Sequence, residues 1–297
     1  MKNIDNTVLK YGASDPKFSV KSPVSPKPQQ GWSLEDRDPA AIATLIPHWQ
    51  WFYNYYFRVQ TSGWHHIPSE NALFVGSHNG GLAAPDLHML MYDWVRHFGA
   101  ERLIYGLMHK GMWQVSPRVA ELATLGGAIR AYPTMARAAL QSGASVAVFP
   151  GGAQDVFRPH RLRDRIYFCD RKGFIKLALQ EEVPIIPFIS WGAHDTLLVL
   201  ADCYQFIKQL HELGLPWLFD TDPTIFPIYL GLPWGLSIGP LPNLPLPSQI
   251  YTQICPPIRF ERYGKQAAKD KAHVQECYEQ VVGTMQTALD QLILRSH

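Results

Sequence analysis

Charged residues and cysteines are scarce in this sequence, and both shortages exclude functions. Of its 297 residues 18% are charged and the formal net charge is +2, so the chain lacks the basic footprint of a nucleic-acid-binding protein. Its four cysteines include no C-x-x-C pair and its histidines lack ligand spacing, so neither a disulfide framework nor a metal site is expected. We therefore expect no nucleic-acid partner, no metal and no bound cofactor.

A secretory signal is also missing, and the long apolar stretch is broken by proline. The first ten residues contain no apolar run of the required length, which favours a cytoplasmic-side location. Residues 223–258 hold no charged residue and are long enough to cross a bilayer, but they include nine prolines. Each proline costs about 3 kcal/mol inside a helix, so this segment is expected to lie on a membrane or to line a pocket.

An aromatic cluster over residues 49–57 provides a second apolar surface. It contains Trp51 and Phe52, and such amphipathic rings suit the headgroup boundary of a membrane. Trp234 and Leu236 are the matching candidates in the uncharged segment. The alternative, ordinary packing of an aromatic helix in a core, stays open. We expect a peripheral or monotopic protein on the cytoplasmic side of a membrane, with these four residues at the membrane or along an acyl groove.

Beyond residue 65, short apolar runs alternate with helical periodicity, which is typical of an α/β domain. We predict one domain with a mixed, mostly parallel central sheet flanked by helices. Residues 1–34, rich in Pro, Ser and Lys, are expected to form a disordered tail. The domain (35–297) divides into an aromatic helical segment (35–64), a core (65–262) and a C-terminal helix (263–297). The predicted strands are 72–76, 102–107, 128–130, 145–149 and 184–190, and the predicted helices are 38–58 (with a break at Pro47), 85–96, 116–125, 134–141, 173–180 and 264–295.

Chemistry is best placed in the glycine-rich loop that follows the first core strand. His78 lies in this loop, at the edge of the sheet where such folds bind ligands. Asp86 follows at the start of a helix, close enough to hydrogen-bond one imidazole nitrogen and leave the other free as a base. The alternative is that His78 occupies a turn and Asp86 caps a helix.

Four blocks in order resemble the phospholipid and glycerol acyltransferase superfamily. They are Ser77–Asp86, Leu125–Arg130, Phe149–Ala153 and Val183–Pro187, and the resemblance covers residues 65–262. It implies a glycerolipid acyltransferase-like fold, with His78 as the general base on a lipid hydroxyl and Asp86 as its orienting partner. It also implies acyl-CoA or acyl-carrier protein as the acyl donor, the carrier protein being then a partner along with the lipid acceptor.

Two departures from that family's common pattern narrow the range of expected acceptor lipids. Seven residues separate His78 from Asp86 where four are common, and Gly151 replaces the glutamate of the third block. Both look more like the branch that holds type-two diacylglycerol acyltransferases and plant phytyl ester synthases. A neutral lipid alcohol such as diacylglycerol, phytol or an isoprenoid quinol is therefore the expected acceptor, with a glycerolipid as the broader possibility.

The substrate-binding candidates lie in the same blocks. The glycine pairs can offer backbone N–H groups to an oxyanion, and the basic side chains can hold phosphates of a donor or a headgroup. Tight turns and a solvated basic loop are the structural alternatives. The candidates are Asn79, Gly80, Gly81, Arg130, Phe149, Pro150, Gly151, Gly152, Arg171 and Lys172.

Two other functions compete with acyl transfer. Gly235–Gly239 matches the G-x-S-x-G pattern of serine ester hydrolases, with Ser237 as the nucleophile. The run of prolines that begins at Pro240 cannot form the helix that a nucleophile elbow requires, which counts against this reading. A non-catalytic lipid-binding protein would keep the apolar surfaces and would have no need of the His78–Asp86 pair.

Overall fold

The computed structural model describes residues 30–217 and 222–296. Most of the expected tail, residues 1–29, lies outside these ranges. Residues 30–34 belong to the packed domain, because the Arg130 side chain donates to the Gln30 carbonyl (2.9 Å) and the Tyr105 hydroxyl donates to the Leu34 carbonyl (2.8 Å). The tail boundary expected at residue 34 is therefore too late.

A seven-stranded sheet forms the centre of the molecule, in the order β1-β10-β6-β2-β5-β3-β4. The five strands from β6 to β4 are parallel, and β10 runs antiparallel to β6 at the other side. The expected α/β domain with a mostly parallel sheet is thus confirmed. The strands are β1 Gln60–Ser62, β2 Leu73–Gly76, β3 Ile104–Met108, β4 Ala128–Arg130, β5 Ser145–Val148, β6 Ile185–Trp191 and β10 Tyr251–Ile254.

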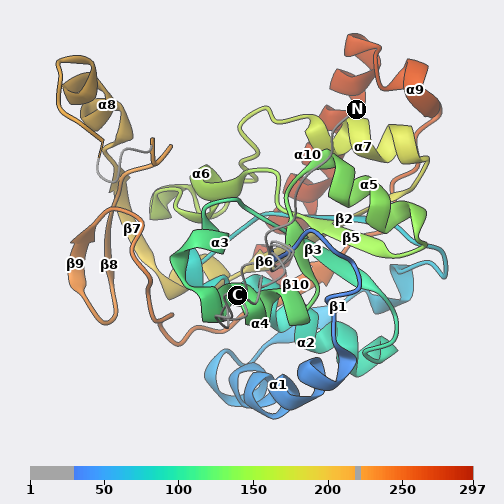
Figure 1. Ribbon diagram of the computed structural model, residues 1–297, viewed down its shortest axis with the longest axis horizontal. Helices are drawn as coiled ribbons and strands as arrows, with labels where there is room; N and C mark the ends of the chain where they lie inside the picture. Colours follow the sequence, from blue (N-terminus) through green and yellow to red (C-terminus); the bar gives the residue numbers. More distant parts are fainter. Residues whose placement is uncertain (1–29, 218–221, 297) are drawn as a thin grey trace, which may run out of the picture.

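Helices cover both faces of this sheet (Figure 1). Helices α5, α7, α9 and α10 lie on one side, and α1, α2 and α4 lie on the other. The bounds are α1 Pro39–Trp51, α2 Pro85–Phe98, α3 Met112–Val115, α4 Pro117–Leu125, α5 Pro133–Gln141, α6 Gly152–Val156, α7 Gly173–Glu181, α8 Tyr204–Glu212, α9 Gly264–Ala267 and α10 Lys271–Ser296. The single C-terminal helix expected over 263–297 is two helices, and α1 passes through Pro47 before a π-helical turn over Phe52–Tyr56.

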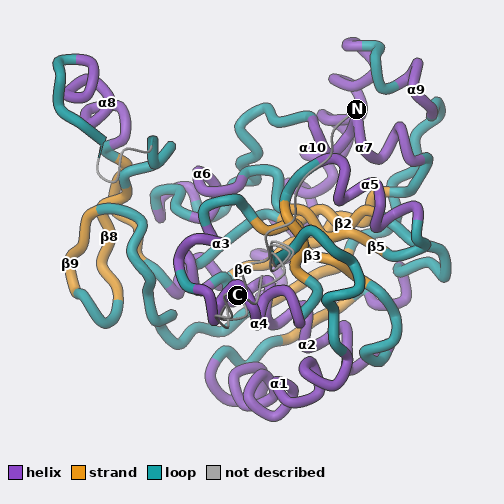
Figure 2. The backbone as a smooth tube through the Cα atoms, in the orientation of Figure 1, coloured by secondary structure: helices purple, strands orange, loops and turns teal. Residues whose placement is uncertain are grey.

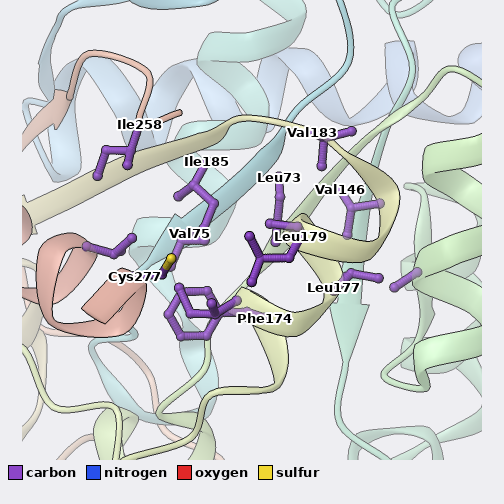
Figure 3. Close-up of a cluster of buried hydrophobic side chains, with 14 of the residues drawn as sticks. Leu73, Val75, Val146, Phe174, Leu177, Leu179, Val183, Ile185, Ile258 and Cys277 are labelled. Carbon is purple, nitrogen blue, oxygen red and sulfur yellow. The ribbon is translucent and has the colours of Figure 1, made fainter. Parts of the chain in front are cut away.

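Alternation along the parallel strands supplies two apolar cores, one on each face. Leu73 and Val75 of β2 point into the larger core, together with Val146 and Ile185 from the neighbouring strands (Figure 3). Phe74 faces the opposite way and packs against helix α2 through Trp94 and Leu90. The strands are buried on both faces, which explains why they are almost continuously apolar in the sequence.

A second, three-stranded antiparallel sheet projects from the main body together with α8 (Figure 2). Its strands are β7 Leu198–Asp202, β8 Pro227–Gly231 and β9 Gly235–Ile238. Strands β8 and β9 lie in the uncharged segment 223–258, and a later part of that segment returns to the main sheet as β10. Among the described residues, no helix is both long and apolar enough to cross a membrane.

Candidate active site

The loop that carries His78 leaves the carboxyl end of β2 in the middle of the sheet. Gly76 ends the strand, and any Cβ there would lie 2.2 Å from the Phe188 ring, so only glycine fits. Gly80 and Gly81 follow with positive φ angles of 80° and 67°, which turn the chain back toward α2. The loop thereby places His78 and the start of α2 side by side.

His78 and Asp86 meet across this turn. The His78 Nδ1 lies 3.4 Å from the Asp86 Oδ1; the imidazole side chain is 20% exposed and the carboxylate is 0% exposed. Asp86 sits in the first turn of α2, where the positive end of the helix dipole favours a carboxylate. The distance is longer than a hydrogen bond, and Nδ1 has no hydrogen-bond partner within the described residues. A partly accessible imidazole thus faces a carboxylate removed from water.

The rest of the Asp86 carboxylate is occupied by the protein. Its Oδ1 also accepts from the Leu87 backbone N–H (2.8 Å), and its Oδ2 accepts from the Asn79 side-chain amide (3.2 Å). Asn79 was expected to contact substrate, but its side chain is buried and engaged on both ends. The Asn79 side chain is therefore taken up by protein partners, among them Asp86.

Phe149 connects the third sequence block to His78. Its ring stacks on the imidazole with centroids 4.4 Å apart and an interplanar angle of 30°. Pro150 and Gly151 are buried at the turn that follows, and the Gly152 N–H donates to the Phe149 carbonyl (3.1 Å), so that amide is not free for an oxyanion. The N–H groups left for such a role in the predicted set are those of Gly151, Gly80 and Gly81.

Two buried residues behind the loop, Asp155 and Arg158, hold it in place and were not predicted from the sequence to do so. Asp155 is 0% exposed, and it accepts from the His78 backbone N–H (2.6 Å) and from the Ser77 hydroxyl (3.2 Å). Burial raises the pKa of Asp155 to about 6, against the opposing effect of the Arg158 guanidinium. Arg158 is 2% exposed and pairs with Asp155. The only sequence signal was their opposite charge three residues apart, directly after the third block.

The other basic candidates are held by partners other than His78. The Arg171 guanidinium donates to the carbonyls of Pro150 and Gly151, so it holds the third-block turn. Lys172, beside it in sequence, pairs with Asp170 at 2.9 Å. Arg130 ends β4, three strands away from β2, and lies between the rings of Trp32 and Trp113. The structure thus places Arg171 near the dyad and Arg130 at the sheet edge.

The apolar candidates are all on the surface. Trp51 and Phe52 are exposed at the end of α1 and the start of the π-helical turn, and Trp234 and Leu236 are exposed on the β8–β9 hairpin. Ser237, the nucleophile of the alternative hydrolase mechanism, lies within β9. It is opposite Tyr229 of β8 in the antiparallel ladder. A serine inside a hairpin strand lacks the strand-to-helix elbow of a hydrolase.

Comparisons with known proteins find a matching family, similar sequences and a similar structure. The sequence profile described as diacylglycerol acyltransferase matches residues 42–286. Uncharacterized proteins of Mycobacterium bovis and Mycobacterium tuberculosis are each 30% identical over 258 residues, which cover 86% of this chain and 68% of theirs. The crystal structure of a 1-acyl-sn-glycerophosphate acyltransferase from Thermotoga maritima is similar with a TM-score of 0.48 and 15% identity, over 86% of this chain and 79% of that one.

A buried histidine next to the site predicts how stability depends on pH. His194 Nε2 donates to the Arg158 carbonyl (2.8 Å), and its other ring nitrogen has no partner within the described residues. Burial, together with the Arg158 charge, lowers the pKa of His194 well below 6.5. The unfolded chain therefore binds a proton that the folded protein excludes, so this contribution to stability is present above pH 6.5 and lost below it.

We expect the free energy of unfolding of the wild type to fall by about 0.8 kcal/mol more than that of His194→Gln between pH 7.5 and 6. Urea denaturation at the two pH values measures this difference. The wild type also contains His88, whose lowered pKa acts in the same direction, and Asp155, whose raised pKa acts in the opposite direction below pH 6. His88 and Asp155 are present in both proteins, so their effects cancel in the comparison. An equal loss of unfolding free energy in the wild type and in His194→Gln would contradict the assignment to His194.

Proposed function

The chain belongs to the diacylglycerol acyltransferase family, and from this membership we propose that it transfers a fatty acyl group from a thioester to the hydroxyl of a lipid alcohol. The observation that carries the proposal is the His78–Asp86 pair: a partly exposed imidazole beside a fully buried carboxylate, at the carboxyl edge of the sheet. A general base needs this combination of access on one ring nitrogen and a fixed partner at the other.

In the proposed reaction the acceptor hydroxyl gives its proton to Nε2 of His78 while its oxygen attacks the thioester carbonyl. The new C–O bond forms, negative charge moves to the carbonyl oxygen, and the C–S bond then breaks. The leaving thiolate takes the proton from the imidazolium, so no covalent enzyme intermediate and no net redox change are required. Asp86 stabilises the transient imidazolium, and the Gly80 and Gly81 N–H groups are the nearest candidates for oxyanion donors.

A neutral alcohol is the proposed acceptor class, with diacylglycerol, phytol and isoprenoid quinols as the leading members. The third-block turn supports this choice, because a Cβ at Gly151 would lie 2.3 Å from the Asp155 side chain, which leaves no space for an acid at position 151. The Arg171 guanidinium is already held by backbone carbonyls beside that turn. Acyl-CoA and acyl-carrier protein are the donor classes proposed.

We further propose that the protein acts at the cytoplasmic side of a membrane and docks there through the outer face of the small sheet. Val199, Tyr229 and Ser237 point inward and are buried, while alternate residues on the other face are apolar and exposed. Antiparallel sheets normally show polar residues on a solvated face. The exposed apolar residues are Leu200, Leu230, Leu236 and Ile238, extended by Leu232, Trp234, Leu241 and Leu244.

The occupant proposed for this face is a lipid surface, because the substrates of the proposed reaction reside there. The face carries no charge, and Trp234 at its tip is a residue type common at the headgroup boundary. It also joins the catalytic loop directly: the Asn243 side chain, which follows β9, donates to the Gly80 carbonyl (3.2 Å). The segment that follows this face is thereby connected to the loop that carries His78.

Replacement of His78 by alanine is expected to lower kcat by about 10² to 10⁴, because the base that accepts the hydroxyl proton is lost. Asp86→Asn should also slow turnover, whereas Ser237→Ala should leave the rate within a factor of two. Initial rates with labelled acyl-CoA and the best acceptor measure all three. Full activity of a folded His78→Ala protein would show that His78 is not the general base. Loss of activity in Ser237→Ala would indicate that Ser237 takes part in the reaction.

The acceptor class is decided by incubation of the protein and labelled acyl-CoA with matched vesicles that contain diacylglycerol, phytol, an isoprenoid quinol or lysophosphatidic acid. We expect ester formation on a neutral alcohol and little on the phosphate-bearing acceptor. Thin-layer chromatography separates the products, and the His78→Ala protein serves as the blank. Transfer to lysophosphatidic acid alone would contradict the neutral-alcohol proposal, and binding without any turnover would favour the non-catalytic alternative.

Membrane docking predicts that Leu236→Asp weakens binding to vesicles, because a charge on the outer face of the small sheet must be desolvated at the membrane. Leu294→Asp changes another strongly exposed leucine, on α10, and is the matched control. We expect at least a fivefold loss of co-sedimentation with phosphatidylcholine vesicles for the first variant only, on the order of 1 kcal/mol. Equal binding by both variants would exclude this face as the docking surface.

A further inference from the structure

The Arg158 guanidinium is buried directly behind the catalytic loop. One of its terminal nitrogens donates to the His78 carbonyl (2.9 Å) and to the Asp155 carboxylate (2.9 Å). The other donates to the Asn79 side-chain oxygen (2.6 Å) and to the Arg163 carbonyl (3.0 Å), and Nε donates to the Leu162 carbonyl (3.1 Å). A single side chain therefore connects the loop of His78 to the segment that follows α6.

Asp155 holds the other side of the same loop residue. Its carboxylate accepts from the His78 backbone N–H (2.6 Å), while Arg158 donates to the His78 carbonyl. The N–H and the C=O of His78 are thus both bound by one buried ion pair. This arrangement restrains the backbone from which the imidazole projects, without contact to the ring itself.

Arg158 and the Ser77 carbonyl, which accepts from Asn79 Nδ2 (3.0 Å), together fix which end of the Asn79 amide meets Asp86. A guanidinium only donates hydrogen bonds, so the Asn79 Oδ1 must face Arg158, and the Nδ2 then faces the Asp86 Oδ2 (3.2 Å). With Oδ2 bound in this way, the Asp86 Oδ1 is the oxygen closest to the His78 ring. The chain of contacts from Arg158 through Asn79 to Asp86 sets the orientation of the carboxylate.

We propose that Asp155 and Arg158 are positioning residues for the base, which hold the His78 backbone and, through Asn79, aim Asp86 at Nδ1. The inference rests on the proposed role of His78 and adds residues that touch neither substrate nor the reacting atoms. It also explains why position 151 is a glycine, since a side chain there would displace Asp155. An ion pair withdrawn from water is a weak source of stability, which favours a positioning role over simple packing.

A matched pair of substitutions tests this role. Asp93 on α2 is also 0% exposed and also pairs with an arginine three residues later, Arg96, but it lies about 10 Å along the helix from Asp86. We expect Asp155→Asn to lower kcat by about tenfold or more with KM changed less than twofold. Asp93→Asn should leave both constants within a factor of two, although both variants lose a buried charge.

A second readout reports on the imidazole without turnover. In ¹⁵N-labelled protein, the His78 ring signals identify which nitrogen carries the proton. We expect the wild type and Asp93→Asn to hold it on Nδ1, facing Asp86, and Asp155→Asn to show a mixture of the two tautomers. Arg158→Lys keeps a charge for Asp155 but lacks the fork that reaches His78 and Asn79 together, so it should show the same mixture and a similar loss of kcat.

The outcomes separate this proposal from the one on which it rests. Wild-type kcat and an unchanged His78 signal in folded Asp155→Asn or Arg158→Lys would overturn the positioning role, whatever His78→Ala shows. Full activity of His78→Ala would overturn the proposal that His78 is the general base. The tautomer measurement would then decide whether Asp155 and Arg158 position the imidazole. If neither variant folds, Asn79→Ala decides: it leaves the ion pair intact, and an unaltered kcat and ring signal would refute the relay to Asp86.

Discussion

The site depends on one constraint: a carboxylate that the fold removes from water must be stabilised by partners inside the protein. Asp86 is 0% exposed, and such burial is costly unless every oxygen finds a donor. The helix start and the Leu87 N–H supply part of that compensation, and Asn79 supplies more. The Asp86 Oδ1 also faces His78, whose side chain is 20% exposed. The loop, the helix start and the buried pair beneath them follow from this requirement.

The same constraint explains why the site contains a second buried ion pair. Asn79 can orient Asp86 only if its own amide is oriented, and Arg158 provides that orientation at the expense of its own desolvation, which Asp155 offsets. Burial raises the pKa of Asp155, and it lowers the pKa of His194, which donates to the Arg158 carbonyl. The stability of the interior behind the His78 loop is therefore sensitive to pH.

Much of the fold could be predicted because its signals are local. The buried parallel strands read as short apolar runs, and the observed β2, β4 and β5 differ from the expected ranges by at most one residue at either end. Strands β1 and β10 at one end of the sheet were missed, because they are short and pair with each other across nearly 200 residues of sequence. The hairpin of β8 and β9 was missed as well, because it lies in the proline-rich uncharged segment.

For the site, the sequence by itself determined the loop, the two residues His78 and Asp86 and the turn that begins at Phe149, because each follows a strand that ends at the same sheet edge. Only the tertiary structure decided that Asn79 points away from a substrate and that Arg158 is internal. Residue type and spacing cannot distinguish a buried guanidinium from a phosphate-binding one. The direction of a side chain depends on what packs behind it, and those partners lie some 80 residues apart in the sequence.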